Sequence, residues 1–160
     1  MGSTSDLPVM EKACKWLDDN EIPFEVNALS AHRTPDAVEA FAKGAQERGI
    51  KVIIAAAGMA AALPGVIAAS TNLPVIGVPI KGMLDGLDAM LSIIQMPPGI
   101  PTATVGVNAA QNAAILAAQI IGLSDSAVAA KVAAHKAGLG AKIEKANKDL
   151  AEVKYNFKTN

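Results

Sequence analysis

The stretch Val52-Ile53-Ile54-Ala55-Ala56-Ala57 decides the fold of this chain. Every residue in it is apolar, so a strand made of it needs cover on both faces. Val75 to Val78 has the same character, and Phe24 to Leu29 and Thr102 to Val107 are two further predicted strands. Amphipathic stretches separate the four. This order is typical of parallel strands joined by helical crossovers, and it predicts an α/β domain.

Helices are expected between and after these strands. Asp6 is the predicted N-cap of the first helix, and Pro35 is the first helical residue after Thr34 in the second. The last helix should bend or split at Gly138-Leu139-Gly140. We expect it to dock on a neighbouring subunit or to fold back on its own domain. The predicted ranges are Asp6 to Asp19, Thr34 towards Gly49, Gly82 to Gln95, Ala109 to Ile121, and Ser124 onward.

The whole chain, residues 1–160, is predicted to be one domain, with residues 124–160 as a helical extension. In such a fold the first loop follows a buried strand of five or six residues, but here only Met1 precedes Gly2. Either an opening strand has been lost ahead of Met1 or another segment supplies it. Loss is the favoured interpretation, because a central strand is costly to omit.

Composition narrows the classes of partner. The chain is 51% hydrophobic, 18% charged and only 3% aromatic, and much of its apolar content is alanine. We therefore expect closely packed elements and a homo-oligomer. A net charge of −1 provides no field that attracts nucleic acid or a membrane surface. A single cysteine, no apolar run of membrane-spanning length and no secretory leader favour the cytoplasm.

Two loops carry the polar chemistry of the amino-terminal region. They are Gly2-Ser3-Thr4-Ser5-Asp6 and Ser30-Ala31-His32-Arg33-Thr34-Pro35. Each leads into a predicted helix, whose amino end directs N–H groups and a positive dipole at the space between the loops. The other histidine, His135, lies in an alanine- and lysine-rich stretch. His32 is therefore the candidate for proton transfer near neutral pH.

The first loop suits a phosphate and a sugar, with serine hydroxyls on the anion and Asp6 accepting from ribose hydroxyls. Arg33 adds a cation suited to phosphate or carboxylate. The alternatives are a serine-rich turn that only caps a helix and a surface salt bridge at Arg33. No Walker or dinucleotide motif is present, so ATP and NAD are poorly supported.

These motifs, followed by Leu63-Pro64-Gly65 and Gln95-Met96-Pro97, give the chain a family resemblance. From Gly2 to about Leu123 it resembles the class I N5-carboxyaminoimidazole ribonucleotide mutases of purine biosynthesis, the PurE family. The resemblance implies a three-layer, flavodoxin-like parallel sheet with helices on both faces. It also implies a homo-octamer with active sites at subunit interfaces, and a reaction that needs no metal or organic cofactor.

The implied reaction moves a carboxyl group from the exocyclic nitrogen of the ribonucleotide to ring carbon C4, through release and recapture of CO2. By resemblance, His32 is the catalytic proton carrier. The implied substrate-binding residues are Ser3, Ser5, Asp6, Ala31, Arg33, Gly58, Ala60, Ala61 and Leu63. A direct CO2-dependent carboxylase acting on aminoimidazole ribonucleotide is the alternative enzyme.

The third loop departs from the family pattern. Members commonly have Gly-Gly-Ala-Ala-His-Leu-Pro-Gly, whereas this chain has Gly58-Met59-Ala60-Ala61-Ala62-Leu63-Pro64-Gly65. Ala62 thus replaces a histidine. One explanation is a natural variant that holds the carboxylate with backbone N–H groups of Ala60 to Leu63. The other is a catalytically impaired, nucleotide-binding protein.

Overall fold

Three parallel strands, in the order β1-β2-β3, form the middle layer of the computed structural model, which describes residues 1–160. Strand β1 spans Ile53–Gly58, β2 spans Val75–Ile80, and β3 contains only Ala103–Thr104. Strands β1 and β2 pair along their full length, from Ile53 with Val75 to Gly58 with Ile80. These are the two strands that the sequence marked as buried on both faces.

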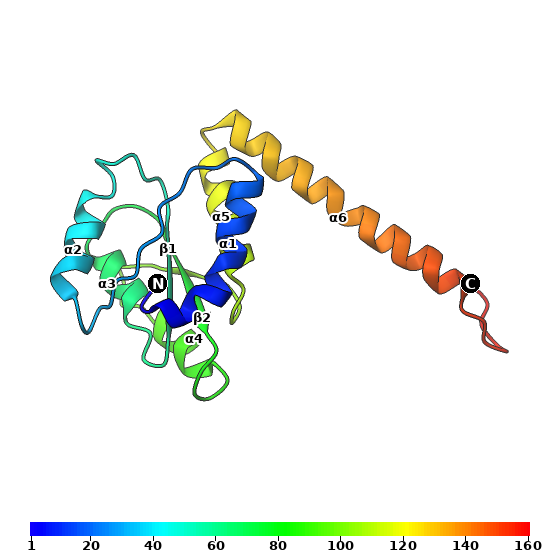
Figure 1. Cartoon of the computed structure of the whole chain (residues 1–160), viewed down its shortest axis with the longest axis horizontal. Coiled ribbons are helices and arrows are strands. Elements are labelled where there is room, and N and C mark those ends of the chain that lie inside the picture. The colour runs from blue at the N-terminus through cyan, green and yellow to red at the C-terminus, as the bar shows by residue number, and fades with distance from the viewer.

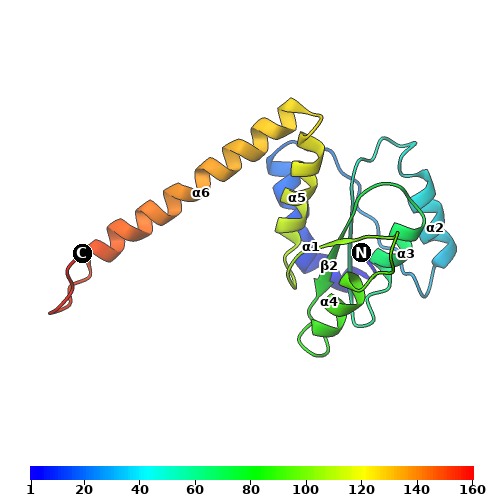
Figure 2. The same cartoon turned by 180° about the vertical axis from the view of Figure 1, so that it is seen from behind.

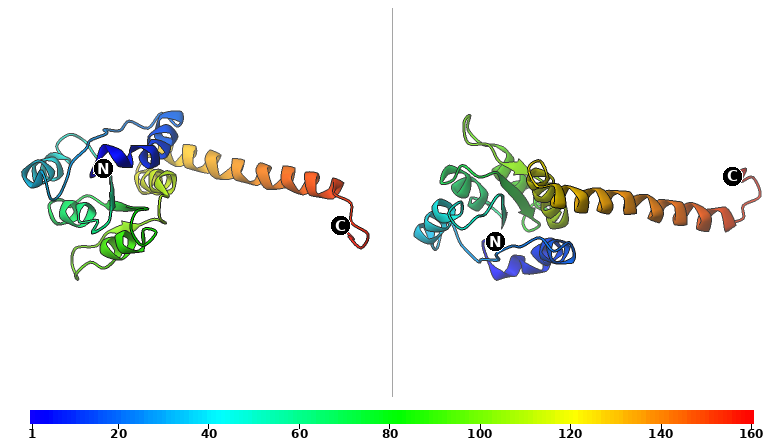
Figure 3. Two further views of the ribbon diagram at one scale, coloured as in Figure 1. Left: turned by 60° about the horizontal axis from the view of Figure 1, so that its bottom comes forward. Right: turned by 90° about the horizontal axis from the view of Figure 1, so that it is seen from above.

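Alternate residues of these strands enter two apolar clusters, one on each face of the sheet. Helices α1 (Leu7–Asp19) and α5 (Ala110–Gly122) cover one face. Helices α2 (Pro35–Gly44), α3 (Leu63–Ala69) and α4 (Leu87–Ile94) cover the other. Figures 1 and 3 show the sheet between these two groups. The predicted three-layer, flavodoxin-like architecture is confirmed.

Small residues let the layers approach closely. The buried face of α5 consists of alanines: Ala110, Ala113, Ala114, Ala117 and Ala118. In β2, a Cβ added at Gly77 would lie 2.3 Å from Cγ2 of Ile93 in α4. The alanine-rich composition thus gives short distances between helices and sheet.

Helix α6 (Ser126–Glu152) leaves this body as a long arm, which Figure 2 shows from behind. Asp125 caps it by accepting hydrogen bonds from the N–H groups of Ala127 and Val128. Near its base, Trp16 Nε1 donates to His135 Nδ1 at 3.2 Å. No residue of α6 is buried. Within one chain, therefore, the arm does not fold back on its domain beyond this base.

The predicted bend in α6 is wrong. The helix continues through Gly138 and Gly140, where an added Cβ would meet no atom within 4 Å. Glycine lowers helix propensity by about 1 kcal/mol, but it keeps the backbone hydrogen bonds of the helix. With nothing packed against these positions, no contact forces the helix to turn.

Two predicted strands differ from the structure. Residues 24–29 form no strand, because their backbone finds only Met1 to pair with. The strand predicted for Thr102 to Val107 shortens to Ala103–Thr104, which pairs with Ile76 and Gly77. After it the chain turns, although the Val105 N–H still donates to the Gly77 carbonyl at 3.2 Å.

Several helix boundaries also differ. Asp6 is the N-cap of α1, as predicted, although its side chain makes no capping hydrogen bond to that helix. Ser3 caps a short 3-10 helix, η1 (Thr4–Asp6), that runs into α1. Helix α2 ends at Gly44, and turns carry the chain to Gly49. Helix α4 begins only at Leu87, because Leu84, Asp85 and Gly86 all have positive φ. The sequence interpretation did not delimit α3. None of the helices is long and apolar enough to cross a membrane.

Candidate active site

Hydrogen bonds within the first loop fold it around a buried carboxylate. The Ser5 N–H donates to Ser3 Oγ, and the Ser3 N–H donates to Asp6 Oδ2, both at 3.3 Å. The Ser5 hydroxyl reaches Asp6 Oδ1 at 3.4 Å. Asp6 is only 8% exposed and is the one buried charged residue of the chain. A carboxylate kept this far from water is held by donors or serves a ligand.

Side-chain contacts between Ser30 and Thr34 close the second loop. Thr34 Oγ1 accepts from the Ser30 N–H at 3.0 Å and donates to the Ser30 carbonyl at 3.1 Å. Ser30 Oγ in turn accepts from the backbone N–H and the Nε of Arg33. Thr34 is therefore used to close the turn rather than to cap α2. This turn presents Ala31, His32 and Arg33 as a group.

The two loops meet at the end of β1. Arg33 Nη2 donates to the Gly2 carbonyl at 3.2 Å, and the Gly2 N–H donates to the Ala56 carbonyl at 3.1 Å. Strand β1 ends two residues later at Gly58, where the third loop begins. These contacts bring the two polar loops together at one rim of the sheet.

The third loop has a strained backbone. Met59 and Ala61 both adopt positive φ, at 56° and 40°, which costs residues with a Cβ about 1–3 kcal/mol each. Met59 is 63% exposed, whereas the side chains of Ala61 and Leu63 are buried. Ala61 and Leu63 can therefore meet a ligand only through their backbone groups.

His32 is exposed and forms no hydrogen bond within the chain. It is adjacent to Arg33, whose guanidinium touches the first loop. One chain therefore brings Ser3, Asp6, His32 and Arg33 to one edge but leaves the imidazole open to solvent. The resemblance implies a closed site for CO2 transfer, and one chain by itself leaves His32 uncovered.

The sequence interpretation did not single out the loop after β2, Lys81 to Gly86. It begins at the same edge of the parallel sheet as the third loop, and Asn108 Oδ1 holds it by accepting from the Lys81 N–H at 2.9 Å. Leu84 and Asp85 adopt positive φ, and Met83 and Leu84 are exposed. The sequence signal for it was two glycines flanking apolar residues between a strand and a helix.

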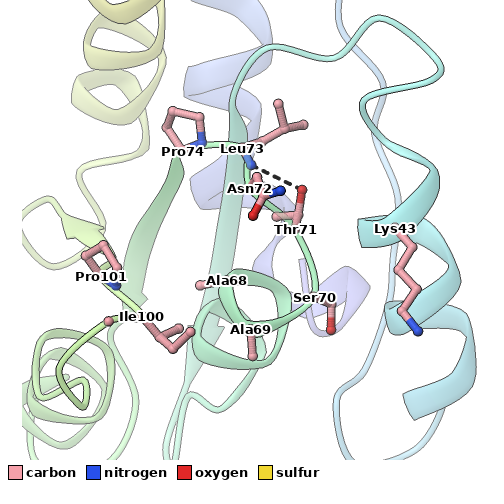
Figure 4. A pocket seen from close by; sticks show the side chains of 11 residues that line it. Lys43, Ala68, Ala69, Ser70, Thr71, Asn72, Leu73, Pro74, Ile100 and Pro101 are labelled. Carbon is pink, nitrogen blue, oxygen red and sulfur yellow. Dashed lines mark hydrogen bonds between the residues drawn. The ribbon is translucent and has the colours of Figure 1, made fainter.

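A pocket of about 700 Å³ lies at the opposite edge, where β2 begins and α3 ends (Figure 4). Ser70, Thr71 and Asn72 line it, and Thr71 Oγ1 accepts from the Leu73 N–H at 3.2 Å. Its one charged residue, Lys43, pairs with Glu39. No predicted site residue lines this pocket, so we place the site at the loops around His32.

The fold and the loops define an α/β protein whose polar site follows the carboxyl ends of parallel strands. The family model described as AIR carboxylase matches residues 1–142. The chain therefore belongs to the AIR carboxylase family, and the PurE-type resemblance is confirmed.

Individual relatives agree with this family. The chain is 50% identical over 156 residues to an N5-carboxyaminoimidazole ribonucleotide mutase of Thermotoga maritima, covering 97% of this chain and 91% of the relative. It is 57% identical over 133 residues to a phosphoribosylaminoimidazole carboxylase of Saccharomyces cerevisiae, covering 82% of this chain and 23% of that protein. Treponema denticola PurE has a similar structure, with TM-score 0.82, 30% identity and 94% of each chain covered.

Proposed function

We propose that this chain is a cytoplasmic N5-carboxyaminoimidazole ribonucleotide mutase of de novo purine biosynthesis. This isomerase converts its substrate to 4-carboxy-5-aminoimidazole ribonucleotide. The observation that carries the proposal is the contact between the two polar loops. The hydrogen bond from Arg33 Nη2 to the Gly2 carbonyl places the histidine turn beside the serine turn.

The first loop and Arg33 bind the ribonucleotide. Ser3 and Ser5 donate to the phosphate or ribose through their hydroxyls, and Asp6 accepts from a ribose hydroxyl. Arg33 uses Nε and Nη2 within the chain, which leaves Nη1 for a phosphate or carboxylate oxygen. Ala31, Gly58, Ala60, Ala61 and Leu63 complete the binding surface, the last two through their backbones.

His32 carries the proton in both half-reactions. Cleavage of the bond between the exocyclic nitrogen and the carboxyl carbon releases CO2, and the nitrogen takes up a proton from the imidazolium. Carbon C4 then attacks the CO2, and loss of the C4 proton to the neutral imidazole restores the ring. The proton balance is closed, so one imidazole can serve both steps.

A neighbouring subunit closes this site, in a homo-octamer. Exposed His32 requires cover, because CO2 must not escape before recapture. Large apolar side chains are exposed on the adjoining loops and on α4, and such patches mark interfaces in proteins. They are Met59, Met83, Leu84, Leu87 and Leu91. A particle mass near eight times the 16.3 kDa chain supports this assembly, and a monomer contradicts it.

A CO2-dependent carboxylase is the second candidate, because the yeast relative carries that name. An ultraviolet assay separates the two. Turnover of the N5-carboxylated ribonucleotide without added bicarbonate supports the mutase. Turnover of aminoimidazole ribonucleotide only at high CO2 supports the carboxylase. Binding of nucleotide without turnover in either assay identifies an impaired protein, for which Ala62 is the prime cause.

A further inference from the structure

The methionine that follows α4 lies against the helix that follows the third loop. A Cβ added at Gly65 would lie 3.2 Å from Sδ and 3.3 Å from Cε of Met96. Gly65 is the third residue of α3, and Met96 comes two residues after the end of α4. The thioether therefore occupies the space that a side chain at Gly65 would need.

The connector after α4, residues 95–101, holds Met96 in place. The Met96 N–H donates to the Ile94 carbonyl at 3.0 Å. Beyond the connector, Thr102 Oγ1 donates to the Ile93 carbonyl at 2.6 Å, so both ends of the connector are joined to the last turn of α4. Two consecutive prolines follow Met96 and restrict the backbone between these ends. Because Ile93 is fully buried, Met96 is fixed relative to the core.

The third loop depends on support from outside itself. Two of its residues, Met59 and Ala61, adopt positive φ, which persists only where the surrounding structure enforces it. The Ala61 N–H donates to the Gly58 carbonyl at 3.0 Å and closes the turn. Ala62 is the N-cap of α3, and no side-chain hydrogen bond caps that helix. The placement of the loop is therefore set by how α3 packs.

Two contacts hold the first turn of α3. Leu63 is buried in the apolar cluster that α2, α3 and α4 share, and Gly65 lies under the Met96 thioether. The Val66 N–H donates to the Ala62 carbonyl at 3.0 Å, which joins the end of the loop to this turn. A shift of the turn therefore moves Ala62 and, through it, the rest of the loop.

We propose that Met96 is a positioning residue for the third loop. Its thioether, seated on Gly65, sets the placement of the loop backbone that binds the ribonucleotide. This role rests on the proposed function, in which the loop binds through backbone groups such as those of Ala61 and Leu63. Without the contact, the strained loop can relax, and its N–H groups then point elsewhere. His32 lies on another loop, so the effect is on binding and not on proton transfer.

The first test compares Met96→Ala with Met90→Ala, which shortens another half-buried methionine within α4. KM for the N5-carboxylated ribonucleotide should rise about tenfold in Met96→Ala and stay within about twofold in Met90→Ala. In both variants kcat should change less than about threefold, because His32 keeps its place. Met96→Leu refills most of the space and should return KM to within about threefold of the original value.

Gly65→Ala probes the same contact from the side of α3. The added methyl would force the thioether to shift by a few tenths of an ångström, so KM should rise about threefold. Together with Met96→Ala, the methyl takes up part of the vacated space. KM of the double variant should then be lower than the product of the two single effects by at least about threefold. If Met96→Ala does not fold, Gly65→Ala decides the question, since it removes no apolar group.

Amide exchange provides a readout that needs no substrate. The N–H groups of Ala61 and Val66 form the bonds that close the third loop and the first turn of α3. In Met96→Ala both should exchange at least about tenfold faster, whereas Met90→Ala should leave them unchanged.

Equal KM values in Met96→Ala and Met90→Ala would overturn the proposal. So would unchanged exchange at Ala61 and Val66, or a KM that Gly65→Ala does not alter. A chain that does not turn over the ribonucleotide would contradict the proposed function alone, because the exchange rates still decide whether Met96 holds the loop.

Discussion

The centre of the sheet and the edge that carries the candidate site differ in how much of their structure one chain supplies. Where the helices cover β1 and β2 the packing is close, with Val38, Ile76 and Ile93 fully buried and Gly77 against α4. At the edge, a few hydrogen bonds hold the loops, and His32 is open to solvent. The difference teaches that stability and chemistry reside in separate parts of this chain, and substitutions can test each part alone.

The largest expected effect is at the edge. His32→Asn should lower kcat by about 10²–10⁴-fold, the range that a general acid or base contributes, while the thermal midpoint stays unchanged. Steady-state kinetics and calorimetry measure the two quantities. His135→Asn, at the only other histidine, is the control and should retain turnover. A His32→Asn protein with normal kcat would remove His32 from the mechanism.

Asp6→Ala should weaken substrate binding. Loss of a charge-assisted hydrogen bond to the substrate costs about 1.5–3 kcal/mol, so KM should rise roughly 10- to 100-fold. The Ser3 N–H also loses its acceptor, and stability should fall by about 1 kcal/mol. Asp125→Ala is the matched control, because it removes another helix cap outside the site. If both variants shift KM equally, Asp6 has no special role toward substrate.

Gly77→Ala tests the packing at the centre of the sheet. The added methyl would clash with Ile93, and such overpacking should lower the free energy of unfolding by about 1–3 kcal/mol. Gly138→Ala in the open part of α6 should raise it by up to about 1 kcal/mol. Urea unfolding of both variants checks the pair. Equal stability of the two would show that the layers can separate more easily than their packing indicates.

His135→Phe tests the base of the arm, which contacts the carboxyl-terminal part of α1, away from the serine loop at the amino end of that helix. It keeps an aromatic ring near Trp16 but removes the Nδ1 acceptor, at a cost of about 0.5–1.5 kcal/mol. Fluorescence of the single tryptophan should change, and the midpoint should fall by roughly 2–4 °C. Lys136→Ala, next in the helix, is the control. An unaltered emission spectrum would mean that the hydrogen bond is absent in solution.

The smallest effect concerns the Met1 amino group, whose pKa is lowered by burial. Between that lowered pKa and the ordinary value near 8, the unfolded chain binds more protons than the folded chain. The free energy of unfolding should therefore rise slightly with pH through this window and gain nothing more above it. Amino-terminal acetylation should abolish this contribution. If the free energy of unfolding still rises with pH after acetylation, other titratable groups cause the rise.

Local patterns predicted the well-buried elements. Strands β1 and β2 follow from continuous apolar runs, and α1, α2 and α5 follow from apolar periodicity with proline or small residues at suitable positions. The predictions that were wrong share another cause. Residues 24–29 have strand composition but lack a neighbouring strand, and Leu84 and Asp85 adopt positive φ that no propensity indicates. Both outcomes depend on contacts with residues that are distant in the sequence.

The candidate site shows the same division. The family motifs identified His32 and Arg33, and the sequence alone indicates that these two adjacent residues share one loop. The contact from Arg33 to Gly2 and the burial of Asp6 could not be read from spacing. The loop from Lys81 to Gly86 was missed because it has no titratable motif typical of catalysis.

By itself, the sequence determined the family, the parallel α/β class and the identity of the chemical groups, because each depends on residue type and local order. Only the tertiary structure decided that His32 remains open within one chain, that α6 continues through its glycines and that a cavity runs beside β1. Each of these features depends on which surfaces pack against one another. Such packing joins segments that are distant in the sequence, so no local sequence pattern predicts it.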